Sequence, residues 1–186
     1  MIRFGLVTYA AFNTREPEAL VEDLLAFEPV ELASYVEGDA VVVRSRSGTA
    51  SIRSADGKTF QYQPRDGDPL KLAGLVGDTT DGRAVLKATV AARHEYPDAL
   101  YRLWRAHFGL AENPPDVIVS LDDGYYSGKG FFGEVVSMAS THGGLNRRNS
   151  ATYFMSTAAP VEGPLRSEDI PQVIEKVFGR PFPYGR

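Results

Sequence analysis

The chain contains no cysteine, no long apolar run and no leader-like start. Without cysteine, disulfides and thiolate metal sites are excluded, so a zinc ion would have to be held by His, Asp or Glu. No apolar run approaches the roughly 20 residues of a membrane-spanning helix. The first residues, MIRFGLVTYAAFN, lack the basic start and the long apolar core of a signal peptide. These absences predict a cytoplasmic protein that does not act at a membrane.

Charge of neither sign dominates: 20 Lys and Arg residues stand against 24 Asp and Glu residues, a net charge of −4. This balance is a poor electrostatic match for a phosphate backbone, so no nucleic acid partner is expected. Hydrophobic residues make up 43% of the 186 residues, which is the share of a folded globular protein. The length allows one domain with a substantial core or two small domains.

The first third of the chain predicts a strand, a helix and a β-meander. FGLVTYAAF is an apolar run typical of a buried strand, and TREPEALVEDLLAF predicts a helix with Thr14 as its cap and Pro17 in its first turn. Short alternating runs follow, and Asp56-Gly57 between two of them favours a hairpin turn, because glycine tolerates positive φ. We therefore expect an antiparallel meander from about residue 30 to residue 63, with one face in water.

The second half alternates helical and strand-like patterns, which predicts an α/β layer. DGRAVLKATVAARHEYPDALYRLWRAHFG predicts two helices broken at Pro97. DVIVSL, EVVSMAS and ATYFMST are strand-like, and RSEDIPQVIEKVFG predicts a last helix with Ser167 as N-cap and Gly179 as its end. We expect Val117–Leu121 and Thr152–Ser156 to be buried strands of one sheet, and the meander to form a separate sheet.

Three histidines are candidates for chemistry: His94, His107 and His142. His107 lies among apolar residues of a predicted helix and His94 precedes a turn, so we interpret both as structural. His142 follows EVVSMAS and is flanked by Gly143 and Gly144, which allow backbone or ligand to approach closely. Ligands of α/β layers gather at strand ends, which favours a metal or catalytic role for His142. A plain loop position for His142 stays open as the alternative.

Other motifs carry a weaker signal. Asp122 and Asp123 end a predicted strand in SLDDGYY, where a simple turn and a functional role are both open. The arginines of SRSGTASIRS fit a solvated face. The glycine-rich runs GDTTDG and SGKGFFG lack the P-loop pattern, and the sequence has no Gly-x-Ser-x-Gly elbow. These absences argue against nucleoside-triphosphate chemistry and against a serine-triad hydrolase.

Three segments carry a family resemblance: PPDVIVSLDDGYY, STHGGLNRRNSATYFMS and GPLRSEDIPQVIEKVFGRPFP. In this order they resemble the C-terminal part of the alkaline phosphatase superfamily, nearest to its type I phosphodiesterase and nucleotide pyrophosphatase branch. The resemblance implies a partial α/β/α layer with an inserted antiparallel meander. It also implies that His142, in the late His-Gly motif, is a ligand of one of two active-site zinc ions, or of another divalent metal. The family's closing pattern, which brings the last helix back onto the sheet, is matched by Gly163, Asp169, Ile170, Pro171, Gly179 and Pro181.

The family's nucleophile and its other metal ligands lie upstream of the matched region, so only His142 carries over. Two zinc ions about 4 Å apart clamp the attacking and leaving oxygens of a phosphoryl transfer, and a catalytic zinc takes about three protein ligands. One histidine cannot hold zinc against water, so the resemblance implies that this chain is inactive alone. Thr141, Asn146, Arg147 and Ser150 follow as candidate substrate-facing or ligand-supporting groups, because a guanidinium can bind phosphate oxygens in a bidentate fork.

The predicted organisation has three parts: a strand–helix segment of the layer (1–29), the meander with a helical insert (30–115), and a C-terminal α/β part with the THGG motif (116–186). The predicted function is that of the C-terminal portion of a metal-dependent phosphoric-ester hydrolase whose substrate is a phosphorylated small molecule. The alternative is a non-catalytic remnant that binds a partner or a phosphorylated ligand. The expected protein partner is the missing N-terminal half or a second copy, because a cut sheet leaves an unpaired edge.

Overall fold

The computed structural model describes residues 7–109, 111–128, 141–158 and 160–181. The chain divides into two compact units, Met1–Ala151 and Thr152–Arg186, and each is described by itself. The elements of the first unit are β1 (Tyr9–Phe12), α1 (Pro17–Leu25), β2 (Val30–Glu37), β3 (Ala40–Ser45), β4 (Gly48–Arg53), β5 (Thr59–Gly67), β6 (Thr80–Asp81), α2 (Gly82–Ala91), α3 (Ala99–Phe108), β7 (Val117–Leu121) and α5 (Arg147–Ser150). The second unit contains a 3₁₀ turn, η1 (Ser167–Asp169), and α6 (Ile170–Phe178).

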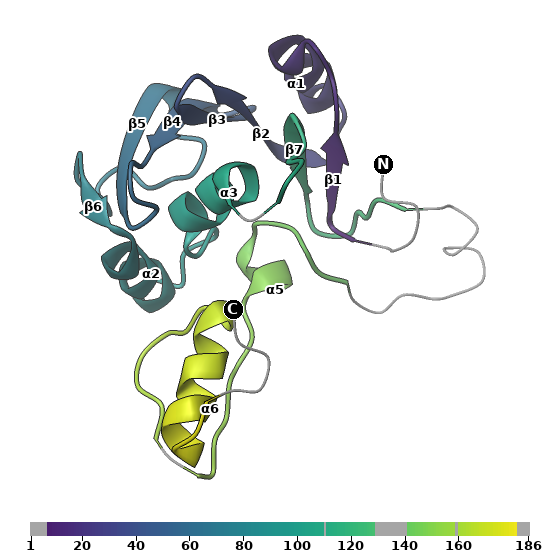
Figure 1. Cartoon of the computed structure of the whole chain (residues 1–186). Helices are drawn as coiled ribbons and strands as arrows, with labels where there is room; N and C mark the ends of the chain where they lie inside the picture. Colours follow the sequence, from purple (N-terminus) through teal and green to yellow (C-terminus); the bar gives the residue numbers. More distant parts are fainter. Residues whose placement is uncertain (1–6, 110, 129–140, 159, 182–186) are drawn as a thin grey trace. The chain divides into compact units, whose positions relative to one another are not determined.

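The strands of the first unit form one seven-stranded antiparallel sheet with the order β1-β7-β2-β3-β4-β5-β6 (Figure 1). Strands β2 to β5 are the meander that the sequence predicts, since each pairs antiparallel with the next along the chain. Strand β7 comes late in the chain but lies between β1 and β2, where Ser120 pairs with Tyr9 and Leu121 pairs with Val30. The expectation of a separate sheet for the meander is therefore wrong, because β7 joins both parts.

Helices cover both faces of this sheet, so the unit is a mixed α/β structure. On one face, Val21 of α1 packs with Val42 and Val119, and on the other, Val41 packs with Leu100 of α3. Successive residues of a strand point to opposite faces, so β3 reads as a continuous apolar run because both of its faces are buried. For β3, the expectation that one face of the meander lies in water is therefore wrong. For β5 that expectation holds at the start of the strand, where buried and exposed residues alternate.

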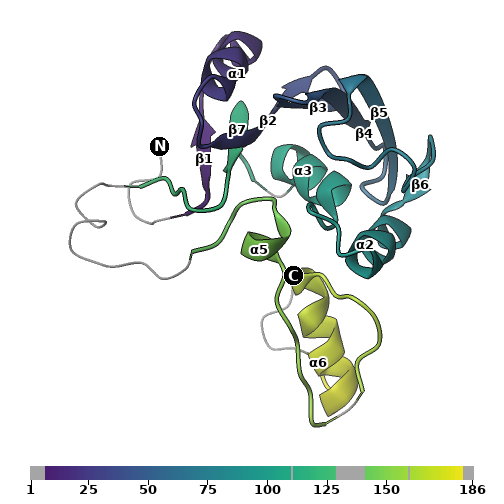
Figure 2. The same cartoon turned by 180° about the vertical axis from the view of Figure 1, so that it is seen from behind.

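The predicted helices of the first unit form where the sequence indicates. The two helices expected around Pro97 are α2 and α3, and α1 begins at Pro17. The expected cap, Thr14, is not the N-cap: Glu16 holds that position without a side-chain cap bond, and Oγ1 of Thr14 accepts the backbone N–H of Glu16 at 3.1 Å. Figures 1 and 2 show β3 to β5 curving around α3, while α1 lies by β1 and β7, away from α2.

The hairpin between β4 and β5 has the Asp56-Gly57 turn that the sequence predicts. Gly57 has a φ of 66°, which favours glycine. Oδ1 of Asp56 accepts the backbone N–H groups of Thr59 at 2.7 Å and Lys58 at 2.8 Å. These two hydrogen bonds stabilise the ionised carboxylate and lower the pKa of Asp56 to about 2.

The second unit departs from prediction at its start and at one helix cap. Thr152–Ser156, expected as a buried strand, has no strand structure, and all five of its residues are exposed. Ser167 does not cap the last helix; instead Oδ2 of Asp169 accepts the backbone N–H of Arg166 at 2.7 Å. Gly179 does end α6, in the left-handed region at φ 64°. The expected strand EVVSMAS lies outside the described residues.

Across the described ranges of both units, no helix combines the length and the apolar character needed to cross a membrane.

Candidate functional site

A polar cavity of about 290 Å³ lies where β2 begins and β7 ends. These two places are adjacent because β2 and β7 pair antiparallel. The connection between α2 and α3 and the short helix α5 supply the rest of its wall. Its lining residues are Glu31, Glu95, Asp122, Asp123, Asn146, Arg147 and Arg148. The fold thus brings together four acidic side chains from three distant parts of the sequence.

Asp123 holds α5 against the end of β7. Its Oδ2 accepts a hydrogen bond from the Arg148 guanidinium at 2.9 Å. Its Oδ1 accepts hydrogen bonds from the side-chain amides of Asn146 at 3.3 Å and Asn149 at 3.4 Å. Asn146 in turn caps α5, because its Oδ1 accepts the backbone N–H of Asn149 at 3.0 Å. The polar groups on this side of the cavity are therefore engaged in fixing the α5 turn.

Glu31 of the cavity lining is hydrogen-bonded to Tyr96, which is not itself part of that lining. The Tyr96 hydroxyl donates to Oε1 of Glu31 at 2.9 Å. Burial raises the pKa of Glu31, and the nearby carboxylates of Asp122 and Glu95 raise it further. Burial also raises the pKa of Tyr96, as does the charge of Glu31. Lys71 offsets part of this negative charge, since its ammonium group pairs with Glu95.

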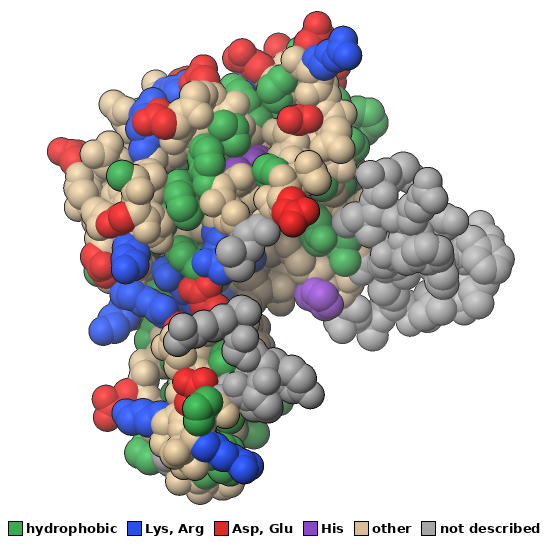
Figure 3. Space-filling model, in the orientation of Figure 1, with side chains coloured by type: hydrophobic (Ala, Val, Ile, Leu, Met, Phe, Trp, Pro, Cys, Tyr) green, Lys and Arg blue, Asp and Glu red, His purple; other side chains and the backbone are tan. Residues whose placement is uncertain are grey.

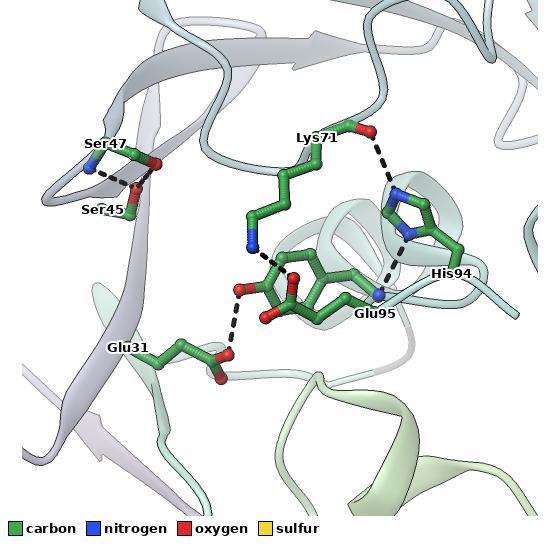
Figure 4. Close-up of polar contacts among 7 residues, drawn as sticks. Glu31, Ser45, Ser47, Lys71, His94 and Glu95 are labelled. Atoms are coloured by element: carbon green, nitrogen blue, oxygen red, sulfur yellow. Dashed lines mark hydrogen bonds and ion pairs between the residues drawn. The ribbon is translucent and has the colours of Figure 1, made fainter.

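His94 fixes the segment that carries Glu95 and Tyr96. Its Nδ1 accepts the backbone N–H of Tyr96 at 3.0 Å, and its Nε2 lies 3.0 Å from the carbonyl oxygen of Lys71 (Figure 4). A nitrogen that accepts cannot carry the proton in a neutral ring, so Nε2–H donates to Lys71. Figure 4 shows the Lys71 side chain pointing toward the carboxylate of Glu95. The prediction that His94 is a hydrogen-bonded loop histidine is confirmed.

His107 is a packed helix histidine, which agrees with the structural role interpreted from the sequence. It lies in α3, is 4% exposed and has its Nε2 3.0 Å from Oγ of the buried Ser34. Burial lowers the pKa of His107 to about 4, because the charged imidazolium would lose its hydration. The ring is therefore neutral at pH 7.

His142 presents an exposed side chain on a backbone segment that the protein holds firmly. The His142 carbonyl accepts the Thr8 backbone N–H at 3.1 Å, and Oγ1 of Thr8 accepts the Gly144 N–H at 2.6 Å. Oγ of Ser120 accepts the Leu145 N–H at 2.9 Å. The segment is thus tied to the residue before β1 and to β7, while the imidazole stays accessible.

Arg102 of α3 holds the same segment from its other side. Its guanidinium donates to the carbonyl oxygens of Gly144 and Leu145, both at 2.8 Å. Gly143 has a φ of 117°, and a Cβ there would lie 2.6 Å from Cδ1 of Tyr9. The close packing of the Tyr9 ring and the positive φ therefore both require glycine at position 143.

The structure places the predicted site residues apart. Asn146 and Arg147 line the polar cavity, but its lining does not include His142, Thr141 or Ser150. Ser150 donates its hydroxyl to the carbonyl oxygen of Asn146 at 2.6 Å and so closes the α5 turn. Four carboxylates stand against two guanidiniums in this cavity, a balance that repels a phosphate anion.

Sequence reasoning missed Glu31, Glu95 and Arg148 as cavity residues. Glu31 carried one usable signal, an acidic residue within the β-like run VELASYVEG. Within the described ranges, no group of three or more His, Cys, Asp or Glu residues is arranged to hold a metal ion. Comparisons of the chain with family models, curated proteins and solved structures found no match.

Proposed function

We propose that this chain is the C-terminal portion of a zinc-dependent phosphoric-ester hydrolase, of the phosphodiesterase, nucleotide pyrophosphatase and alkaline phosphatase type, and that His142 supplies one metal ligand. The observation that carries the proposal is the exposed imidazole on a fixed backbone. A ligand that is already held in place loses little conformational freedom when it binds a metal.

The layer arrangement adds support. Helices on both faces of the sheet are compatible with the α/β/α layering that the resemblance implies, whereas β2 to β5 belong to the same antiparallel sheet as β1 and β7 and do not form a separate insert. We propose that the first unit is a partial layer of the alkaline phosphatase type on the placement of the helices alone. The Asp122-Asp123 turn and the THGG segment lie at neighbouring ends of this layer, because Ser120 of β7 contacts Leu145 directly.

The metal itself requires donors beyond His142. The described residues supply one exposed imidazole and no cluster that completes a zinc site, whereas a catalytic zinc takes about three protein ligands. The residues present therefore do not fit a complete centre, and we propose that the remaining ligands and the nucleophile belong to an upstream polypeptide. A direct consequence is that the chain alone hydrolyses neither phosphate monoesters nor diesters.

The non-catalytic alternative has less support. A remnant that binds a phosphorylated ligand needs a cationic pocket, but the polar cavity carries an excess of carboxylates and Arg148 already pairs with Asp123. Arg147 lines the same cavity and faces the same negative field. A phosphate bound there would be repelled unless a cation accompanied it.

Zinc titration calorimetry tests the proposal. The chain should bind zinc weakly, His142→Ala should lose that binding, and the matched variant His94→Ala should keep it. Coexpression with the polypeptide encoded directly upstream should raise the affinity by orders of magnitude and give zinc-dependent hydrolysis of p-nitrophenyl phosphate or bis-p-nitrophenyl phosphate. Zinc-dependent turnover by the chain alone, or tight binding unchanged in His142→Ala, would contradict the proposal.

A further inference from the structure

A second cavity, of about 210 Å³, lies between α3 and the β1-β7-β2 part of the sheet. Figure 3 shows hydrophobic side chains gathered over the region of α3 on this face. Most of the residues in the cavity wall are apolar, and four of them are buried: Leu32, Leu103, Val119 and Leu145. Apolar cavities of roughly 150 Å³ take up benzene, so this volume suits one ring or a short alkyl chain.

Arg102 is the one charged side chain among the described residues that form this wall. Its three hydrogen bonds go to the carbonyl oxygens of Pro97, Gly144 and Leu145. A guanidinium has five N–H groups, so two of them have no acceptor within the described parts of the chain. Arg102 also forms no ion pair there, and Asp98, whose charge acts on it, does not line the cavity. The wall thus contains a cation with donors to spare and no anion.

Ser120 supplies a further donor to the same wall. It is buried, and its Oγ accepts the backbone N–H of Leu145 at 2.9 Å. The hydroxyl proton has no acceptor among the residues that the structure describes, so the O–H group is able to donate to a ligand. Ser34, the other serine of the wall, differs, because its Oγ donates to the carbonyl oxygen of Ile118 and lies 3.0 Å from Nε2 of His107.

We propose that this cavity binds a small organic monocarboxylate, whose carboxylate meets Arg102 and Ser120 and whose aryl or short alkyl part lies against the apolar wall. A guanidinium and a carboxylate match in geometry and form charge-assisted hydrogen bonds. Burial lowers the pKa of Arg102, because the charged guanidinium loses hydration, and an adjacent anion offsets that loss. One guanidinium neutralises a monoanion, whereas a phosphate monoester would keep a second negative charge without a cation in this wall. The inference goes beyond the proposed function and needs no metal at His142.

Benzoate is the probe, and three molecules with the same ring are its counterparts: toluene, benzylamine and phenyl phosphate. Titration followed by NMR should show benzoate binding with a Kd on the order of 1 mM, with shifts at Leu103 and Val119. Toluene and phenyl phosphate should bind at least tenfold more weakly, and benzylamine should not bind. Ala106 is exposed on α3 and lines the cavity, so Ala106→Trp should block it and weaken benzoate binding at least tenfold. Ala91→Trp, at an exposed alanine of α2 outside the lining, is the matched control.

Two further comparisons isolate the role of charge. Arg102→Met should weaken benzoate binding at least tenfold and leave toluene binding in place, which checks that the cavity persists. Ala106→Glu and Ala106→Gln form a pair of equal size that leaves the Arg102 hydrogen bonds intact, and both residues suit a helix. Benzoate should bind at least fivefold more weakly to Ala106→Glu than to Ala106→Gln, while toluene should bind the two variants equally.

The outcomes separate this inference from the proposed function. Benzoate binding that Ala106→Trp removes, and that Ala91→Trp and His142→Ala preserve, supports the cavity assignment even if His142 proves not to bind zinc. Benzoate binding no tighter than that of toluene or phenyl phosphate overturns it, as does equal benzoate binding by Ala106→Glu and Ala106→Gln. Benzoate binding unchanged in Ala106→Trp would place the ligand elsewhere and also overturns the inference.

Discussion

The described part of residues 7–151 contains two cores of buried apolar side chains, whereas the described residues of 152–181 contain no buried apolar side chain. Phe60 is 0% exposed in the first unit, but Phe178 is 64% exposed at the end of α6. Tyr153 and Met155 are each 80% exposed. A nine-residue helix is shorter than the roughly 12–15 residues that a helix needs to persist alone in water. The comparison teaches that the first unit carries its own stability and the second carries little.

The strongest test of this contrast is Phe60→Ala. Phe60 packs in T-shaped arrangements with Tyr101 and Trp104 in the core under α3. Loss of a buried phenylalanine removes its transfer free energy and leaves a cavity, so the free energy of unfolding should fall by about 3–5 kcal/mol. Urea denaturation measures it. A loss below about 1 kcal/mol would show that this core is loosely packed.

Acid should weaken the first unit through His107. Its pKa is about 4 when folded, against an ordinary value of 6.5, so the unfolded chain binds more protons between these values. The stabilising effect is therefore complete above pH 6.5 and is lost as the pH falls toward 4, by up to about 1.4 kcal/mol per pH unit. The urea midpoint, measured across this pH range, should depend less on pH in His107→Gln than in the parent protein. An unchanged slope in that variant would assign the acid sensitivity to other groups.

Arg102→Met should loosen the His142 segment while the helix keeps its side-chain volume. The carbonyl oxygens of Gly144 and Leu145 lose their donor, at a cost of about 2 kcal/mol. Amide exchange at Gly144 and Leu145 should quicken. Arg65→Met is the matched control, because Arg65 pairs with Glu37 on the surface, where such pairs contribute less than about 1 kcal/mol. Equal losses of unfolding free energy in the two variants would show that Arg102 does not position this segment.

The smallest effect is expected from Phe178→Ala in α6. Its side chain is largely exposed, so the substitution should change the free energy of unfolding by less than about 0.5 kcal/mol. Thermal denaturation followed by circular dichroism measures it beside Phe60→Ala. A cost that matches the one at Phe60 would break the contrast between the two units.

Local patterns predicted the elements whose partners are close in the sequence. The meander, the break at Pro97 and the Gly179 end follow from turn chemistry and periodicity. Thr152–Ser156 failed because β-forming residues make a strand only when a neighbouring strand offers backbone partners. The place of β7 depends on non-local pairing, which no local pattern contains.

The candidate sites divide in the same way. The structural roles of His94 and His107 followed from their neighbours in the chain. The acidic cavity did not, because Glu31 and Glu95 meet Asp122 only after the sheet and the α2–α3 connection have folded. The sequence indicated that the small size of Gly143 matters. It could not identify Tyr9 as the side chain that packs against Gly143, because Tyr9 lies far away in the sequence.

The insertion of β7 between β1 and β2 sets an order of events on the ribosome. β1 and β2 are made early, yet the strand that separates them emerges only after both helices of the α3 side. At roughly 5–20 residues per second, the two early strands wait on the order of ten seconds with open edges. During that interval they are free to pair with each other in a wrong sheet or with another nascent chain. Slower translation before Val117 should therefore lower the yield of soluble protein, and a trigger-factor-like chaperone should restore it.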